Sequence, residues 1–273
     1  MDGTTSGRTE PVAEDLGAAR KLHIVLARTG LSRFGSFRDR AIAALTLIVF
    51  ATFVLVAPFR PELAVRLAAK DGHDGAFIEI ATVVVLLPGI GIGLAGLALR
   101  RTAAPWVRVW LALWTLAAIF FASEECSWGQ WIWGWETPAA VAGLNRQGET
   151  NLHNISTWLN QKPQAFGEIF IFLAGVVLPA LALIDVPQSS SVLRGGRASW
   201  ILAAPSLIPA GLLHGTTKVC CWLVGPQRLT LGAPEVQEFA IAWFMTLYLW
   251  SLVGRMGQER TDIRAISASP AGS

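Results

Sequence analysis

The sequence predicts an all-α fold, a polytopic helical membrane bundle of about six transmembrane helices. Charged residues make up only 15% of the 273 residues and hydrophobic residues 53%, whereas roughly a quarter of a typical soluble domain is charged. Several uncharged apolar runs approach the roughly 20 residues that an α-helix needs to cross a bilayer. In lipid, only α-helices and closed β-barrels satisfy the hydrogen bonds of the backbone. These runs lack the alternation of apolar and polar residues that is typical of barrel strands. A helical bundle follows.

Six apolar runs form a single transmembrane bundle over 41–254, between a basic N-terminal tail (1–40) and a C-terminal tail (255–273). The predicted spans are, in order, 41–59, 76–99, 105–123, 166–185, 198–214 and 236–254. The first run begins too far along the chain for a cleaved signal peptide, so we expect it to stay as an anchor. The polar and aromatic residues between the third and fourth spans predict a re-entrant or amphipathic cap on the outer side.

The distribution of basic residues predicts the orientation. If the N-terminus is cytoplasmic, 15 of the 22 Lys and Arg residues fall on the inner segments. Lys and Arg residues are enriched on the cytoplasmic side of membrane proteins, so both termini are expected to be cytoplasmic. The membrane is expected to be the bacterial cytoplasmic (cell inner) membrane. Because no basic stripe is interleaved with aromatic residues, nucleic acid is not an expected partner, and membrane lipids are.

The second span contains a glycine pattern with two interpretations. Gly91, Gly93 and Gly96 spell GxGxxG, the dinucleotide-binding fingerprint, but they lie inside an apolar span with no preceding soluble strand. Gly89 and Gly93 also spell GxxxG, which lets two helices approach closely. We therefore expect helix packing at this site.

Two adjacent carboxylates, Glu124 and Glu125, end the third span. Acidic residues near a helix N-terminus complement the helix dipole, but this pair lies at a C-terminal end, where the dipole opposes them. Ionisable groups at such depth usually face a cavity or a partner. The pair is therefore a candidate catalytic site.

A second candidate stretch, 149–154, reads ETNLHN. If it is helical, Glu149 and His153 share one face and can relay a proton or hold a metal ion. Three of the four histidines fall on the predicted outer side, and His73, His153 and His214 are the candidate metal ligands. A divalent metal such as zinc, held by three histidines and a water, would supply a hydroxide nucleophile. The alternative is a hydrogen-bonded lid in which these histidines bind no metal.

Four tryptophans follow the acidic pair, at 128, 131, 133 and 135. Tryptophans at the end of a span are typical of the aromatic belt at the membrane surface. An aromatic wall over the acids is the alternative.

The segments EECSWGQ and NLHN together resemble a signature, EExSWGQ followed by NLHN, found in a group of uncharacterised bacterial multi-pass membrane proteins. The likeness covers roughly 70–160 and includes Glu79 near the start of the second span. It implies that the matching polar residues form one site, but it implies no reaction. The candidate substrate-binding residues are Ser127, Trp128, Gln130, Asn151, Asn154 and Glu79.

Three classes of function stay open at this point. The first is a hydrolase or transferase that acts on a lipid or lipid-linked substrate at the outer face, metal-dependent if the histidines meet, with Glu124, Glu125, Glu149 and His153 as catalytic groups. The second is a non-catalytic structural or accessory membrane subunit, and the third is a transporter or proton-coupled carrier. The inner halves of the spans carry almost no ionisable residues, which disfavours a proton path across the bilayer.

Overall fold

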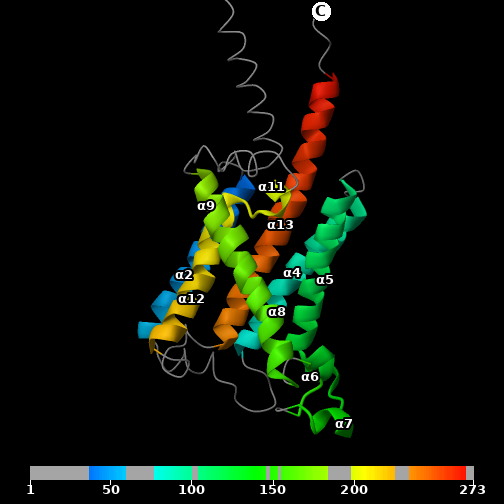
Figure 1. The fold of residues 1–273 in the computed structure, drawn as a ribbon, viewed down its shortest axis with the longest axis vertical. Coiled ribbons are helices and arrows are strands. Elements are labelled where there is room, and N and C mark those ends of the chain that lie inside the picture. Colours follow the sequence, from blue (N-terminus) through cyan, green and yellow to red (C-terminus); the bar gives the residue numbers. More distant parts are fainter. Residues whose placement is uncertain are drawn as a thin grey trace, which may run out of the picture.

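The computed structural model describes residues 37–59, 77–99, 104–145, 148–152, 155–183, 198–224 and 234–268. These residues contain helices and no strand, so the all-α prediction is confirmed for them. The longer helices lie roughly along one axis as a bundle (Figure 1). Their bounds are α2 Phe37–Phe59, α4 Phe77–Leu99, α5 Pro105–Glu125, α8 Thr157–Phe170, α12 Ile208–Val224 and α13 Pro234–Ala268.

Short helices occupy the two ends of the bundle. The end where α5 stops carries the 3₁₀ turn η2 (Ser127–Gly129) with α6 (Gln130–Trp133) and α7 (Ala139–Ala142), and we call it the cap end (Figure 1). The opposite end carries α9 (Leu178–Leu183) and α11 (Ala198–Ile201). The interval between the third and fourth predicted spans is thus folded into a compact group of short helices and turns.

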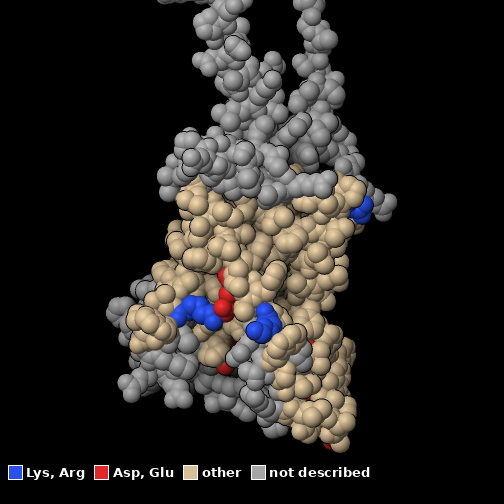
Figure 2. All heavy atoms as spheres, in the orientation of Figure 1, with Lys and Arg blue, Asp and Glu red and all other residues tan. Residues whose placement is uncertain are grey.

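Four helical segments are long and apolar enough to cross a membrane. They are Phe77–Leu99, Pro105–Glu125, Lys162–Leu181 and Pro234–Gly257. The visible face of the described surface also shows a broad band without charged side chains (Figure 2). Exposed apolar side chains on a surface of this extent suit contact with lipid and not with water.

Helix α13 forms the centre of the bundle. In its apolar window 78% of the residues are buried, against 28 to 33% in the three other candidate spans. Tyr248 is fully buried on this helix, accepts a hydrogen bond from Trp110 Nε1 at 2.7 Å and donates one to the Ile201 carbonyl at 2.7 Å. Its hydroxyl therefore ties α5 and α11 to the central helix.

The glycines of α4 permit its close approach to two neighbours. A Cβ at Gly89 would lie 2.7 Å from Thr246 Oγ1 of α13, and a Cβ at Gly93 would overlap the Thr115 side chain of α5. The packing interpretation of GxxxG is therefore confirmed, although the two glycines face different helices. A Cβ at Gly91 would meet nothing within 4 Å.

We expect Gly93→Ala to lower the free energy of unfolding by about 1–3 kcal/mol, because the added methyl group forces α4 and α5 apart. Gly91→Ala is the matched control on the same helix and should leave stability unchanged or slightly raised. Thermal unfolding of both variants in detergent measures the difference. Equal melting temperatures for the two variants would contradict this packing.

The apolar run predicted as the fifth span, 198–214, is not one helix. It comprises α11, an extended stretch, the 3₁₀ turn η5 (Pro205–Leu207) and the first part of α12. Pro205 and Pro209 lack the amide hydrogens that a continuous helix requires, so the long helix begins at Ile208.

The extended stretch before η5 is buried, and its backbone is satisfied by other parts of the chain. The Ala203 amide donates to the Ala174 carbonyl at 3.0 Å, within the π-helix η3 (Ile171–Val177) that follows α8. The Arg255 side chain donates to the Trp200 carbonyl at 3.2 Å. Irregular backbone at membrane depth requires such protein partners.

Candidate functional site

The chain reverses at the end of α5 through a left-handed turn. Ser127, Trp128 and Gly129 have φ values of 47°, 58° and 91°. A positive φ costs about 1–3 kcal/mol at a non-glycine residue, and it persists where the surrounding structure imposes it. The turn brings the indole of Trp128 back over α5, where Nε1 donates to Glu124 Oε1 at 2.5 Å.

The buried network that holds this turn comes from the segment 145–152. Glu149 Oε2 accepts hydrogen bonds from Ser127 Oγ at 2.9 Å and from Asn151 Nδ2 at 2.7 Å. Asn145 Nδ2 donates to both oxygens of Asn151, backbone and side chain, at 2.8 Å. Ser127 and Asn151 are 0% and 2% exposed, so these bonds replace water entirely.

A second group of polar contacts joins the same two segments farther out. Gln130 Oε1 accepts from the Thr150 amide at 2.9 Å and from the Thr150 hydroxyl at 3.0 Å, and Gln130 Nε2 donates to Thr137 Oγ1 at 2.9 Å. The conformation of the cap therefore depends on side chains more than on regular secondary structure.

Glu124 connects this network to the interior of the bundle. Its Oε2 accepts the Leu152 amide at 2.8 Å while Oε1 accepts Trp128. The residue is 3% exposed, and both oxygens accept N–H groups, as those of an ionised carboxylate do. Glu124 thus fixes the cap loop, and Leu152 becomes part of the wall of a pocket.

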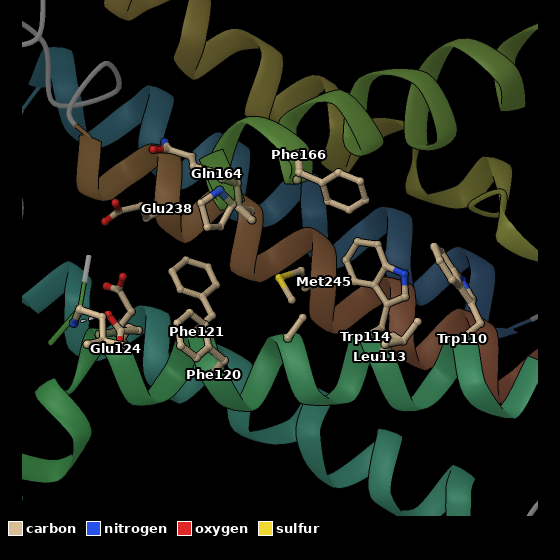
Figure 3. A pocket seen from close by; sticks show the side chains of 16 residues that line it. Trp110, Leu113, Trp114, Phe120, Phe121, Glu124, Gln164, Phe166, Glu238 and Met245 are labelled. Atoms are coloured by element: carbon tan, nitrogen blue, oxygen red, sulfur yellow. Dashed lines mark hydrogen bonds between the residues drawn. The ribbon is translucent and has the colours of Figure 1, made fainter. Parts of the chain in front are cut away.

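This pocket, of about 440 Å³, lies between α5, α8 and α13. Its volume is within the range of roughly 300–1,000 Å³ that is usual for small-molecule sites. Acidic side chains gather at one end, and the rest of the wall is aromatic and aliphatic (Figure 3). The lining residues are Trp110, Leu113, Trp114, Ala117, Phe120, Phe121, Glu124, Glu125, Leu152, Pro163, Gln164, Phe166, Gly167, Glu238, Ile241 and Met245.

The pocket is accessible from the side of the bundle. Leu113 of α5 and Phe166 of α8 line it and are 54% and 68% exposed. Both lie within helical segments that are apolar enough to span a membrane. The pocket is therefore bordered by side chains on the apolar outer surface of these two segments.

The candidate catalytic residues fall in different places. Glu125 lines the pocket and is buried, as Glu124 is. Glu149 belongs to the hydrogen-bonded cap, and its segment is an irregular loop over 148–152, not a helix. The helical i, i+4 argument therefore does not apply to Glu149, and His153 lies outside the described residues.

The candidate substrate-binding residues are mostly cap residues. Ser127, Gln130 and Asn151 bond other residues of the cap, and Trp128 bonds Glu124 and packs edge-on against Phe120 with ring centroids 6.0 Å apart. Glu79 is buried in the first turn of α4 and is not among the residues of the pocket wall. Asn154 lies outside the described residues.

His214 is the one candidate metal ligand that the structure describes. It is buried on α12, one turn before Lys218, which pairs with Glu168 at 2.6 Å, and it does not line the pocket. Among the described residues, no three His, Cys, Asp or Glu side chains are grouped to hold a metal ion. His73 and His153 lie outside those residues, so the three-histidine site stays a prediction that elemental analysis of purified protein can test.

The pocket residues Glu238, Trp110 and Trp114 carry no site signal of their own in the sequence. An acid near a helix start complements the helix dipole, and aromatic residues four positions apart are usual in helix packing. The available signal is the spacing of Trp110, Trp114 and Phe121, at intervals of four and seven residues, because it places these aromatic side chains on one face of α5. It does not reveal which helix that face opposes.

Comparisons with family models, with curated proteins and with solved structures find no match.

Proposed function

We propose that this chain is an integral membrane hydrolase or transferase that acts on a lipid or lipid-linked substrate taken from the bilayer. The observation that carries the proposal is the pocket, which opens laterally among apolar side chains and ends at carboxylates from two helices, Glu125 of α5 and Glu238 of α13. A few convergent polar groups in an otherwise apolar pocket are typical of a binding or reaction site.

The two carboxylates supply a general base and a general acid. In hydrolysis, Glu238 takes a proton from water as the water oxygen attacks the substrate, and Glu125 gives a proton to the departing group. Carboxylates in unlike environments can divide these roles, and Glu125 is buried whereas Glu238 is half-buried. Glu124 acts as a positioning residue, because the Trp128 and Leu152 N–H groups hold it.

The membrane arrangement in this proposal has six spans. Helices α2 and α12 run beside the four long apolar segments and complete the set (Figure 1). The excess of basic residues on the predicted inner segments of the sequence supports cytoplasmic termini and a site on the non-cytoplasmic side of a bacterial inner membrane. The EExSWGQ and NLHN segments support membership of the group that carries them, with a shared cap.

We expect wild-type protein, reconstituted with a total bacterial lipid extract, to convert at least one lipid species into a product detectable by mass spectrometry. Ala117→Trp should abolish the conversion, because Ala117 lines the pocket and an indole there would fill it. Leu116→Trp is the matched control, since Leu116 is exposed on the same helix and is not part of the lining.

Two results would contradict the proposal. One is conversion by Ala117→Trp at the wild-type rate. The other is an unchanged lipid profile with folded wild-type protein, which would favour a structural or accessory role.

A further inference from the structure

The pocket wall is acidic at one end and apolar along the rest of its length (Figure 3). Glu124 and Glu238 lie at one end, Met245 lies midway, and Trp114 and Trp110 lie toward the other end. A ligand that matches this wall has a polar head at the cap end and an apolar body directed into the bundle.

All charged groups of the wall that the structure describes have one sign. Glu124, Glu125 and Glu238 line the pocket, and no Lys, Arg or His residue is among the described lining residues. Lys162 is adjacent in sequence to a lining residue, Pro163, but is exposed and outside the lining. Like charges repel strongly in a site shielded from water, so a phosphate or carboxylate head is disfavoured there.

Aromatic rings lie next to the acidic end. Phe120 and Phe121 follow the carboxylates along the pocket (Figure 3). The face of an aromatic ring attracts an ammonium group, and the attraction grows when water is excluded. Carboxylates and aromatic faces together form the usual surroundings of a bound amine.

The volume of the pocket limits the apolar part of the ligand. About 440 Å³ lies toward the lower end of the roughly 300–1,000 Å³ that is usual for pockets that hold one drug-sized ligand. The space therefore favours one apolar chain over two.

We propose that the ligand of this pocket is a lipid with a single apolar chain in the pocket and a cationic amine head group at the carboxylates. The inference rests on the proposed function, since it names the substrate class of the same site. The experiment below separates the two.

The test measures binding of three probes with the same tail, hexadecylamine, 1-hexadecanol and hexadecyl phosphate, to the full-length chain in maltoside micelles. We expect hexadecylamine to bind at least about tenfold more tightly than the other two. Glu238→Gln should weaken hexadecylamine about tenfold, the loss usual for one charged hydrogen bond, and leave hexadecanol unchanged. Glu235→Gln is the matched control, because Glu235 precedes it by one turn on α13 and does not line the pocket.

If the three probes do not bind as expected, the Ala117→Trp variant shows whether the amine head group or the lipid pocket itself is wrong. Equal binding of the three probes, or unchanged amine binding by Glu238→Gln, overturns the amine head group if Ala117→Trp still removes binding. In that case the lipid pocket stands. Unchanged binding of every probe by Ala117→Trp overturns the pocket, the proposed function and this inference together.

Discussion

Glu125→Gln is expected to lower the rate of lipid conversion by at least about 100-fold, the lower limit usual for loss of a general acid–base group. Glutamine keeps the size and hydrogen-bonding shape of glutamate but exchanges no proton under these conditions. Glu125 lines the pocket from the last residue of α5, so the change removes the general acid without filling the pocket. The rate is measured by mass spectrometry in reconstituted bilayers, at saturating and at low substrate.

The controls for this prediction separate chemistry from folding. Glu235→Gln should convert substrate at the wild-type rate, since Glu235 lies outside the pocket wall. Glu124→Gln should loosen the cap, because an amide cannot present acceptors to both Trp128 and the Leu152 N–H. A Glu125→Gln variant with wild-type turnover would exclude Glu125 as the general acid.

Glu149→Ala is expected to free the cap from its fixed conformation. The change removes the acceptor for Ser127 Oγ and Asn151 Nδ2, and each buried group left unsatisfied costs about 1–3 kcal/mol. The left-handed turn then loses the contacts that hold its positive φ values. Amide hydrogen exchange over 127–152, followed by mass spectrometry, should show faster exchange there and unchanged protection in α13.

Glu136→Ala is the matched control for that experiment. Glu136 lies in the same cap but is exposed, so its loss should leave the exchange pattern as in wild type. Equal protection of 127–152 in the Glu149 and Glu136 variants would show that the buried network does not determine the conformation of the cap.

Patterns within single segments were predictable from the sequence. Apolar runs without charge indicate helices in lipid whatever their partners, and the all-α class followed from that. The small residues at Gly89 and Gly93 predicted close packing, because only the absence of a side chain permits it. The position of Glu124 and Glu125 at a helix C-terminus marked them for attention, since the helix dipole opposes them there.

The tertiary structure alone decided what those residues do. Helical periodicity places Trp110, Trp114 and Phe121 on one face of α5, but the opposing α8 and α13 come from distant parts of the chain. The different roles of Glu124 and Glu125 follow only from a tertiary contact, the hydrogen bond from the Leu152 amide, 28 residues away, to Glu124. The proline-interrupted run 198–214 likewise needed Ala174, Tyr248 and Arg255 to satisfy its backbone. The local sequence determines which side chains lie on each face of a helix. The packing of distant segments against one another determines which of those side chains come into contact.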